Sequence, residues 1–247
     1  MTLSKAKIKW VQQLAHKKYR KQLGLFVAEG DKMVTELLQT MPCEALFYTD
    51  AYTGPKRAVQ SILVEYAALC KISRLETPQN VLGVFRIPAH NWSIDALSNQ
   101  LLLAIDGVQD AGNMGTIIRL ADWFGITTIL CSGNTVDVYN PKVVQATMGA
   151  LARVCVHTVS LPDVLPQLGM PICITALDGD NIYQANLPQH GVIVMGNEGN
   201  GVSDAVKAIA THSLLIPPFP EGRTTSESLN VGVATAVVCA EFRRRQL

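Results

Sequence analysis

The chain has 247 residues, of which 48% are hydrophobic and 17% charged, and its formal net charge is +1. This composition can fill a sizeable core in one large domain or two small ones, and it excludes a globally basic nucleic-acid-binding protein. No apolar run approaches the ~20 residues of a membrane span and no signal-peptide core opens the chain, so we expect a cytoplasmic protein. The six cysteines form no CxxC pair and have no histidines at zinc spacing, which predicts buried thiols and no metal.

The first 32 residues are basic, and Ile8, Val11 and Leu14 recur there at helical spacing. A charge run of this kind is usually a solvated helix face. The alternative is an arm that contacts RNA phosphates, with an aromatic ring available for stacking. The candidate phosphate contacts are Lys7, Lys17, Lys18, Arg20 and Lys21.

Residues 1–95 are predicted to form a small α/β domain, because short apolar runs alternate with amphipathic stretches. The predicted strands are 26–28, 46–48, 72–75 and 81–85, and the predicted helices are 31–39 and 55–69. The polar stretch 88–100 is a predicted linker.

Residues 96–247 are predicted to form a second α/β domain, which begins with a continuous apolar strand at 101–105. Its further predicted strands are 128–131, 154–157, 172–176, 192–195 and 214–216, and its predicted helices lie around 117–124, near 141, at 161–168 and after 230. About six strands with intervening helices favour a parallel sheet covered by helices on both faces.

Two strand ends near the C-terminus predict a cofactor crevice. The first strand ends in a turn containing Gly196, Gly199 and Gly201, and the second ends at Pro217 and Pro218. Glycines let a backbone approach a ligand closely, and a prolyl loop holds an extended shape. The chain lacks the GxGxxG, GxxxxGK[ST], HExxH and GxSxG motifs, which argues against dinucleotide binding, nucleotide hydrolysis, zinc and acyl-enzyme chemistry.

Three spaced motifs resemble the signatures of the SpoU (TrmH) family of RNA ribose 2′-O-methyltransferases, in the SPOUT superfamily. They are Asn113-x-Gly115-x-x-x-Arg119, Val194-Met195-Gly196-Asn197-Glu198-Gly199-x-Gly201, and Ser228-Leu229-Asn230-Val231-x-Val233-Ala234. The resemblance covers nearly the whole chain, since residues 17–38 resemble the family's N-terminal RNA substrate-binding domain.

The resemblance implies a deep trefoil knot in the second domain, S-adenosylmethionine as cofactor, and a homodimer; the expected absence of a metal and of a membrane span rests on the composition and the missing motifs. It implies cofactor contacts at Leu177, Met195, Gly196, Gly201, Ile216, Pro218 and Leu229. It implies catalytic roles for Arg119, Asn113, Glu198, Ser228 and Asn230, and RNA contacts that include Glu29 and Arg223. Arg119 is expected to contact the RNA phosphate rather than act as a base, because a guanidinium stays protonated in proteins.

Each motif residue also has a purely structural interpretation. Asn113 and Ser228 suit helix N-caps, and Glu198 could be a solvated loop charge. The chain also departs from the family pattern at Ala111, at Gln145 and in its longer loop 217–227, whose effects stay open.

The predicted function is therefore methyl transfer from S-adenosylmethionine to a ribose 2′-hydroxyl of ribosomal or transfer RNA. Two alternatives remain: a knotted enzyme that methylates a base, and a non-catalytic RNA-binding or assembly protein that kept the fold. The sequence does not identify the modified nucleotide.

Overall fold

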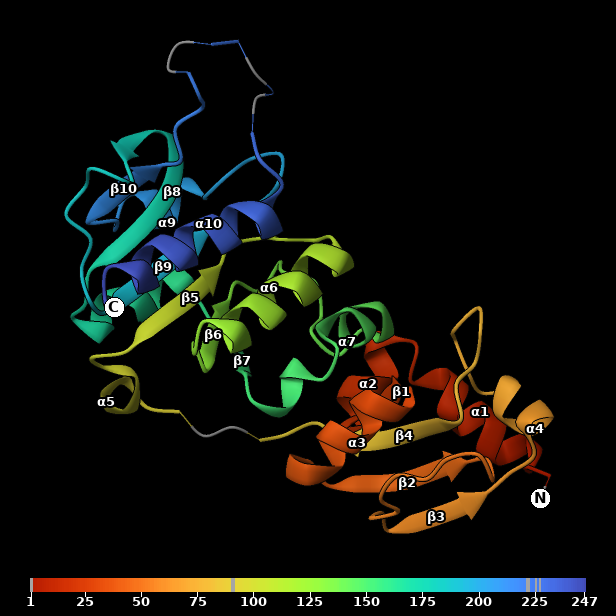
Figure 1. Cartoon of the computed structure of the whole chain (residues 1–247). Helices are drawn as coiled ribbons and strands as arrows, with labels where there is room; N and C mark the ends of the chain where they lie inside the picture. The colour runs from red at the N-terminus through yellow and green to blue at the C-terminus, as the bar shows by residue number, and fades with distance from the viewer. Residues whose placement is uncertain (1, 90–91, 221–222, 225, 227) are drawn as a thin grey trace. The chain divides into compact units, whose positions relative to one another are not determined.

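The computed structural model describes residues 2–89, 92–220, 223–224, 226 and 228–247. The chain divides into two compact units (Figure 1). The first contains Met1–Ala89 and Asp137–Arg153, and the second contains His90–Val136 and Val154–Leu247. The stretch 137–153 thus packs with the first unit, although its chain neighbours on both sides belong to the second.

The first unit is built on a four-stranded sheet with the order β1-β4-β2-β3. β4 (Val81–Arg86) is antiparallel to both β1 (Leu25–Glu29) and β2 (Cys43–Tyr48), and the edge strand β3 (Gln60–Leu63) is parallel to β2. The helices of this unit are α1 (Lys5–Gln13), α2 (Lys17–Leu23), α3 (Asp31–Thr40), α4 (Tyr66–Cys70), α7 (Pro141–Thr147) and the short 3-10 helix η1 (Ala150–Ala152).

Two predicted elements of the first unit are wrong. The stretch 55–69, predicted as one helix, contains β3 and the start of α4. The stretch 72–75, predicted as a strand, is a turn: Ile72 is buried, and the following residues bind the carboxylate of Glu29 instead of a neighbouring strand. The backbone N–H of Arg74 donates to Glu29 Oε1 at 2.9 Å, and the hydroxyl of Ser73 donates to Oε2.

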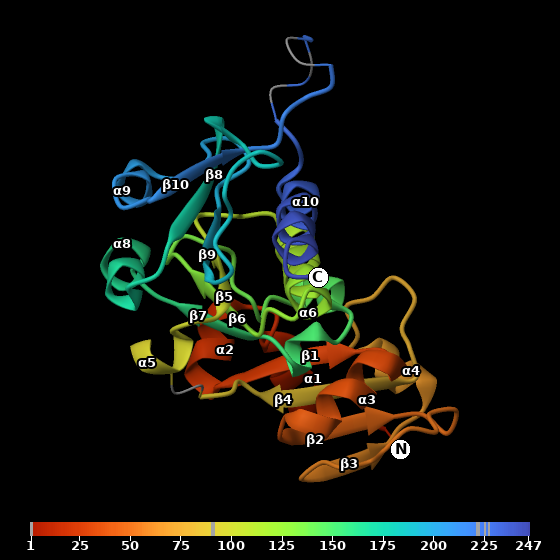
Figure 2. The same cartoon turned by 60° about the vertical axis from the view of Figure 1, so that its left-hand side comes forward.

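The second unit is built on a six-stranded, wholly parallel sheet, which confirms the predicted fold class. In spatial order its strands are β10 (His212–Leu215), β8 (Ile172–Asn181), β9 (Gly191–Met195), β5 (Leu101–Ile105), β6 (Thr128–Cys131) and β7 (Cys155–Thr158). Figure 2 shows helices on both faces of the sheet. α6 (Ala111–Trp123) and α10 (Val231–Arg244) cover one face, and α8 (Leu161–Val164) and α9 (Asp204–Lys207) lie on the other.

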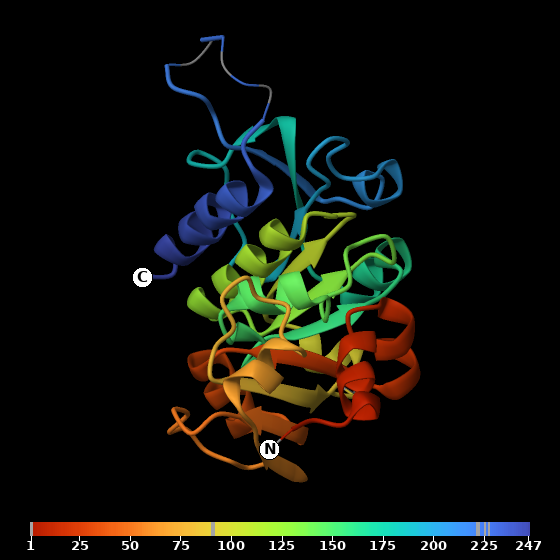
Figure 3. The same cartoon turned by 90° about the vertical axis from the view of Figure 1, so that its right-hand side faces the viewer.

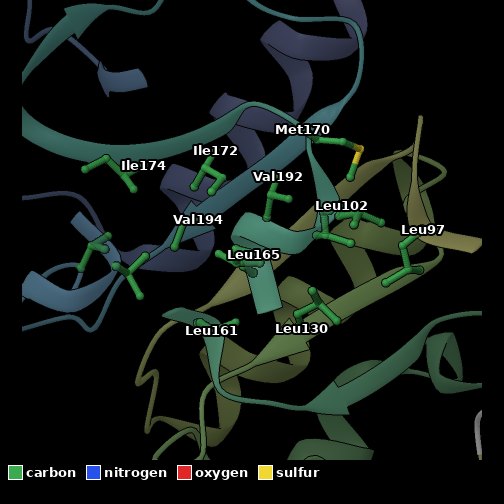
Figure 4. Packing of buried hydrophobic residues seen from close by; sticks show 14 residues of the cluster. Leu97, Leu102, Leu130, Leu161, Leu165, Met170, Ile172, Ile174, Val192 and Val194 are labelled. Carbon is green, nitrogen blue, oxygen red and sulfur yellow. The ribbon is translucent and has the colours of Figure 1, made fainter. Parts of the chain in front are cut away.

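A buried apolar cluster fills the α8 side of this sheet (Figure 4). Alternate residues of each strand point into it, such as Leu102 of β5, Ile172 of β8 and Val192 of β9. They meet Leu161 of α8 and Leu165 of the 3-10 helix η2 (Leu165–Leu168). Each such fully buried side chain contributes roughly 1.5–3 kcal/mol relative to exposure, so this layer stabilises the packing of the helices against the sheet. A further short helix, α5 (Ile94–Leu97), lies within the predicted linker and adds Leu97 to the cluster.

α6 and α10 pack side by side on the opposite face (Figures 1 and 3, yellow-green and blue). α6 buries Met114, Ile117, Ile118 and Ala121, a spacing that places all four on one helical face. Within the part of the chain that the structure describes, no helix is long and apolar enough to cross a membrane.

Candidate active site

A cavity of about 720 Å³ opens at the carboxyl ends of β8, β9 and β10. This is the edge at which parallel α/β sheets bind ligands, and the volume lies in the range of small-molecule sites. The sequence-predicted residues that line the cavity are Leu177, Met195, Gly196, Gly201, Ile216 and Leu229, together with Glu198 and Ser228. Pro218, also predicted as a cofactor contact, is exposed and does not line the cavity.

The loop that follows β9 forms one wall of the cavity, and Asn197 shapes it. The side-chain Oδ1 of Asn197 accepts the backbone N–H groups of Gly199 and Asn200 at 2.9 and 3.1 Å. Its Nδ2 donates to the carbonyl of Gly107 at 2.8 Å. Asn197 and Gly201 also exchange two backbone hydrogen bonds of 2.9 Å each. The loop is therefore closed on itself and tied to the end of β5.

Gly196 is required by close packing inside this loop. A Cβ atom at Gly196 would lie 2.3 Å from the backbone of Gly201 and Val202, which is too close for any side chain. Gly201 has φ +68°, a conformation that glycine adopts readily. The glycine-rich turn thus allows backbone to meet backbone, in addition to any approach to a ligand.

Asp106 is a second anchor of the loop. It follows β5 directly, is 6% exposed, and its Oδ2 accepts the backbone N–H of Ser203 at 2.8 Å. Asn197 lies inside the second sequence motif but was assigned no role from it, and Asp106 lies outside all three motifs. A buried strand that ends in a carboxylate was the available signal for Asp106.

Asn113 joins the three sequence motifs. Its Nδ2 donates to Glu198 Oε1 at 2.9 Å, and its Oδ1 accepts from Asn230 Nδ2 at 2.9 Å. Oδ1 of Asn230 in turn accepts the backbone N–H groups of Gly232 and Val233, which caps α10. Because Oδ1 of Asn230 is used in this way, its amide must face Asn113, which leaves the Asn113 amide to donate to the carboxylate. Hydrogen-bond donation therefore runs in one direction, from Asn230 to Asn113 and from Asn113 to Glu198.

The structural interpretations of the motif residues are partly resolved. Asn113 is not the N-cap of α6: Asp110 is, and its Oδ1 accepts the Asn113 backbone N–H at 2.7 Å. Asn230 is both a cap and a partner of Asn113. Glu198 is exposed but bound to Asn113.

Arg119 is not brought into the cavity. It lies six residues after Asn113 on α6, which turns it about 240° around the helix and moves it about 9 Å along the axis. Arg119 is exposed, and no described residue forms a hydrogen bond or ion pair with its guanidinium.

The predicted RNA contacts separate into two groups. Lys17, Lys18 and Lys21 of α2 are exposed, as is Arg223, while Lys7 is half-buried and donates to Gln60. Two predicted contacts are instead interior residues: Arg20 is 2% and Glu29 6% exposed. Burial raises the pKa of Glu29, and its carboxylate holds the turn at Ser73 and Arg74. Arg20 and Glu29 therefore do not face RNA in this structure.

Known families match both parts of the chain. The model of the SpoU rRNA Methylase family matches residues 100–240, and that of an MRM3-like substrate binding domain matches residues 5–83. The chain belongs to the SpoU rRNA methylase family. This confirms the family predicted from the three motifs.

Individual relatives are similar to this chain over nearly its whole length. The chain is 30% identical to the 23S rRNA (guanosine(2553)-2′-O)-methyltransferase RlmP of Bacillus subtilis, over 96% of each protein. A solved protein of the TrmH family from Porphyromonas gingivalis is 40% identical with a TM-score of 0.89, over 99% of this chain and 100% of that one. An AdoMet-bound rRNA methyltransferase from Sinorhizobium meliloti is 26% identical with a TM-score of 0.84, over 100% of this chain and 98% of that one.

Proposed function

We propose that this protein transfers a methyl group from S-adenosylmethionine to a ribose 2′-hydroxyl of ribosomal RNA. The observation that carries the proposal is the Glu198–Asn113–Asn230 connection, which gathers all three family motifs beside the cavity. The full-length likeness to a 23S rRNA 2′-O-methyltransferase supports the choice of reaction and of RNA class.

The cavity suits S-adenosylmethionine in size and in chemistry. Met195, Ile216 and Leu229 supply apolar walls for a flat purine, and the glycine turn supplies backbone donors and acceptors for its edge. Glu198 brings a carboxylate to the rim, where it faces a cationic ligand favourably. Bound S-adenosylmethionine would supply a methyl group on a positively charged sulfur; transfer of that methyl to the ribose oxygen would release the neutral thioether S-adenosylhomocysteine and the hydroxyl proton.

The protein's own residues hold the reacting groups in place. Asn113 fixes the loop after β9 to the start of α10, so both walls of the cavity keep one spacing. Alignment of this kind supplies much of the rate in a displacement between two bound molecules. Arg119 positions an RNA phosphate, because its guanidinium is permanently charged and has no partner among the described residues.

RNA binds the first unit through α2. Lys17, Lys18 and Lys21 are exposed around this helix, and no described residue pairs with their ammonium groups. The match of residues 5–83 to a substrate-binding domain supports this assignment. Such contacts position RNA without reading its sequence, so nucleotide choice depends on other residues.

The protein acts as a homodimer that pairs through α6 and α10. Trp123 is 84% and Val233 53% exposed, and Arg119 lies one turn before Trp123 on the same helical face. An exposed tryptophan beside an arginine is typical of an interface between subunits. A second copy on this face would place its Arg119 near the first copy's site, which accounts for a guanidinium outside its own cavity.

The test is transfer of label from radiolabelled S-adenosylmethionine to separate pools of unmodified ribosomal and transfer RNA. Digestion should yield a labelled 2′-O-methylnucleotide from ribosomal RNA, and Arg119→Ala should abolish it. Label from transfer RNA would change the substrate class, and label on a base would favour the base-directed alternative. Absence of both label and cofactor binding would favour a non-catalytic RNA-binding protein.

A further inference from the structure

The guanidinium of Arg20 is buried beneath the basic helix α2. Its Nε and Nη2 donate to Oδ2 of Asp137 at 3.1 and 2.5 Å, and its Nη1 donates to the carbonyls of Leu14 and Ala15 at 2.8 Å each. Arg20 thus ties α2 to a residue 117 positions later in the chain. Its neighbours Lys17, Lys18 and Lys21 stay exposed.

Asp137 also forms backbone and side-chain hydrogen bonds within the first unit. Its Oδ1 accepts the backbone N–H of Tyr139 at 3.0 Å, and its carbonyl accepts that of Asn140 at 2.9 Å. The ring of Tyr139 packs against Phe26 of β1, with ring centroids 4.9 Å apart. Asp137 therefore begins the stretch 137–153 as part of the first unit.

The residue immediately before Asp137 belongs to the catalytic unit. Val136 donates its backbone N–H to the carbonyl of Val108 at 2.9 Å. Val108 lies in the loop 106–110, whose Gly107 carbonyl binds Asn197 and whose Asp110 caps α6 at Asn113. A single peptide bond, between Val136 and Asp137, links the Arg20 ion pair to the loop that holds Asn113.

Stability alone does not explain this ion pair. A buried pair is often no more stabilising than apolar side chains of the same volume, because both charges must leave water. The guanidinium instead fixes an orientation: two of its N–H groups converge on Oδ2 of Asp137, while Oδ1 accepts the backbone N–H of Tyr139, and together these contacts hold the carboxylate in one orientation.

We propose that Arg20 and Asp137 are positioning residues for methyl transfer. They hold the peptide at Val136–Asp137 so that the loop 106–110, and Asn113 beyond it, keeps its geometry while α2 binds RNA. The proposal rests on the proposed function. It identifies Arg20 and Asp137 as the two side chains that connect the RNA-binding helix α2 to the residues around the reacting groups.

The first test is Asp137→Asn, which keeps the size of the side chain and removes its charge. We expect kcat to fall by about tenfold or more, with KM for RNA and Kd for S-adenosylmethionine within about threefold of the unsubstituted protein. The matched control is Glu36→Gln, which breaks the ion pair with Arg153 at the other end of the same stretch, 3.1 Å long and more exposed. Its kcat should stay within about twofold.

The second test does not depend on activity. Hydrogen exchange at the backbone N–H groups of Val136 and Asn113 should be at least about fivefold faster in Asp137→Asn than in Glu36→Gln, because the loop loses its fixed connection. The paired variant Arg20→Met with Asp137→Leu removes both charges together, so neither is left unpaired: its kcat should fall as far as that of Asp137→Asn, and its thermal unfolding shows whether it is still folded at the assay temperature.

Unchanged exchange, an unchanged kcat, or an equal loss in Glu36→Gln would overturn the proposal. If the unsubstituted protein methylates no RNA, the proposed function fails on its own, and the exchange experiment still decides whether Arg20 and Asp137 hold the loop.

Discussion

Asn230 donates its side-chain Nδ2 to Oδ1 of Asn113 across 2.9 Å, although 117 residues separate the two in the chain. The bond joins the first turn of α6 to the cap of α10. Since Asn113 also donates to Glu198, one amide side chain holds together three loops that contribute to the candidate active site.

Asn113→Asp should lower kcat about a hundredfold, because it replaces an amide donor to Glu198 with a second carboxylate and misaligns the loops. Combining it with Glu198→Gln should restore activity to within about tenfold, since the glutamine amide can donate to the new carboxylate at position 113 and so keep a hydrogen bond between the two positions, with donor and acceptor exchanged. Single-turnover methylation of RNA measures both. If the paired variant is no better than Asn113→Asp alone, activity requires the Glu198 carboxylate or the original direction of this hydrogen bond, and contact between the two positions is not sufficient.

Gly196→Ala should abolish binding of S-adenosylmethionine, because the new Cβ would lie 2.3 Å from the backbone of Gly201 and Val202. Gly199→Ala is the matched control, since its Cβ would meet nothing closer than Asn197 Oδ1 at 3.6 Å. Titration calorimetry should show a Kd within about threefold for the control. Equal affinity in the two variants would show that the turn tolerates a side chain at Gly196.

Replacing Lys17, Lys18 and Lys21 together by glutamine should weaken RNA binding and reduce the slope of log affinity against log salt by about 2–3. The charge-matched control replaces Lys56, Arg57 and Lys71 of the same unit. Fluorescence anisotropy over a salt series measures the slope. A larger loss in the control would move the RNA surface away from α2.

Trp123→Glu should convert the proposed dimer to a monomer, because it would place a charge in the apolar contact proposed between subunits. Leu63→Glu, at an exposed position of β3, is the control and should leave the mass of the assembly in solution unchanged. Sedimentation velocity distinguishes the two. A monomeric unsubstituted protein would contradict the proposed assembly directly.

Acid should destabilise the second unit through Glu241. Hydrogen bonds from Arg244, and then from Arg245, lower the pKa of Glu241 from 4.5 to about 2, against the opposite effect of its burial. Because the folded pKa lies below the unfolded one, the stabilisation is fully present above about pH 5 and is lost as the pH falls toward 2. Glu241→Gln should cost about 2 kcal/mol at pH 7 and flatten the acid limb of the stability curve. Glu44→Gln, which breaks the exposed pair with Arg86, is the control in urea unfolding at several pH values.

Local patterns predicted the second unit well. Its central strands β5, β6 and β9 are short, mostly apolar runs buried on both sides, and this signal does not depend on which strand lies next to which. β3 of the first unit was missed because it is an edge strand with one neighbour and little burial, so a short amphipathic run there does not distinguish strand from helix. The turn after Ile72 depends on Glu29, a partner more than 40 residues away.

The same reasoning explains which site residues were found. Asn113, Glu198 and Asn230 belong to motifs, and the structure brings them together. Arg20 was grouped with its lysine neighbours because a sequence shows a charge but not the acid that it meets. Asp137 distinguishes Arg20 from those lysines, but it belongs to no motif or periodic run in the sequence that would have predicted the pairing.

The stretch 137–153 has a consequence for how such a protein can diversify. The chain passes between the two units at three places, after residues 89, 136 and 153. An exchange of the first 89 residues with those of a relative would therefore bring in a new Phe26 and Arg20 while keeping the old Tyr139 and Asp137. New RNA specificities are thus expected to arise by coordinated point changes on both segments, and a single recombination event would leave mismatched partners.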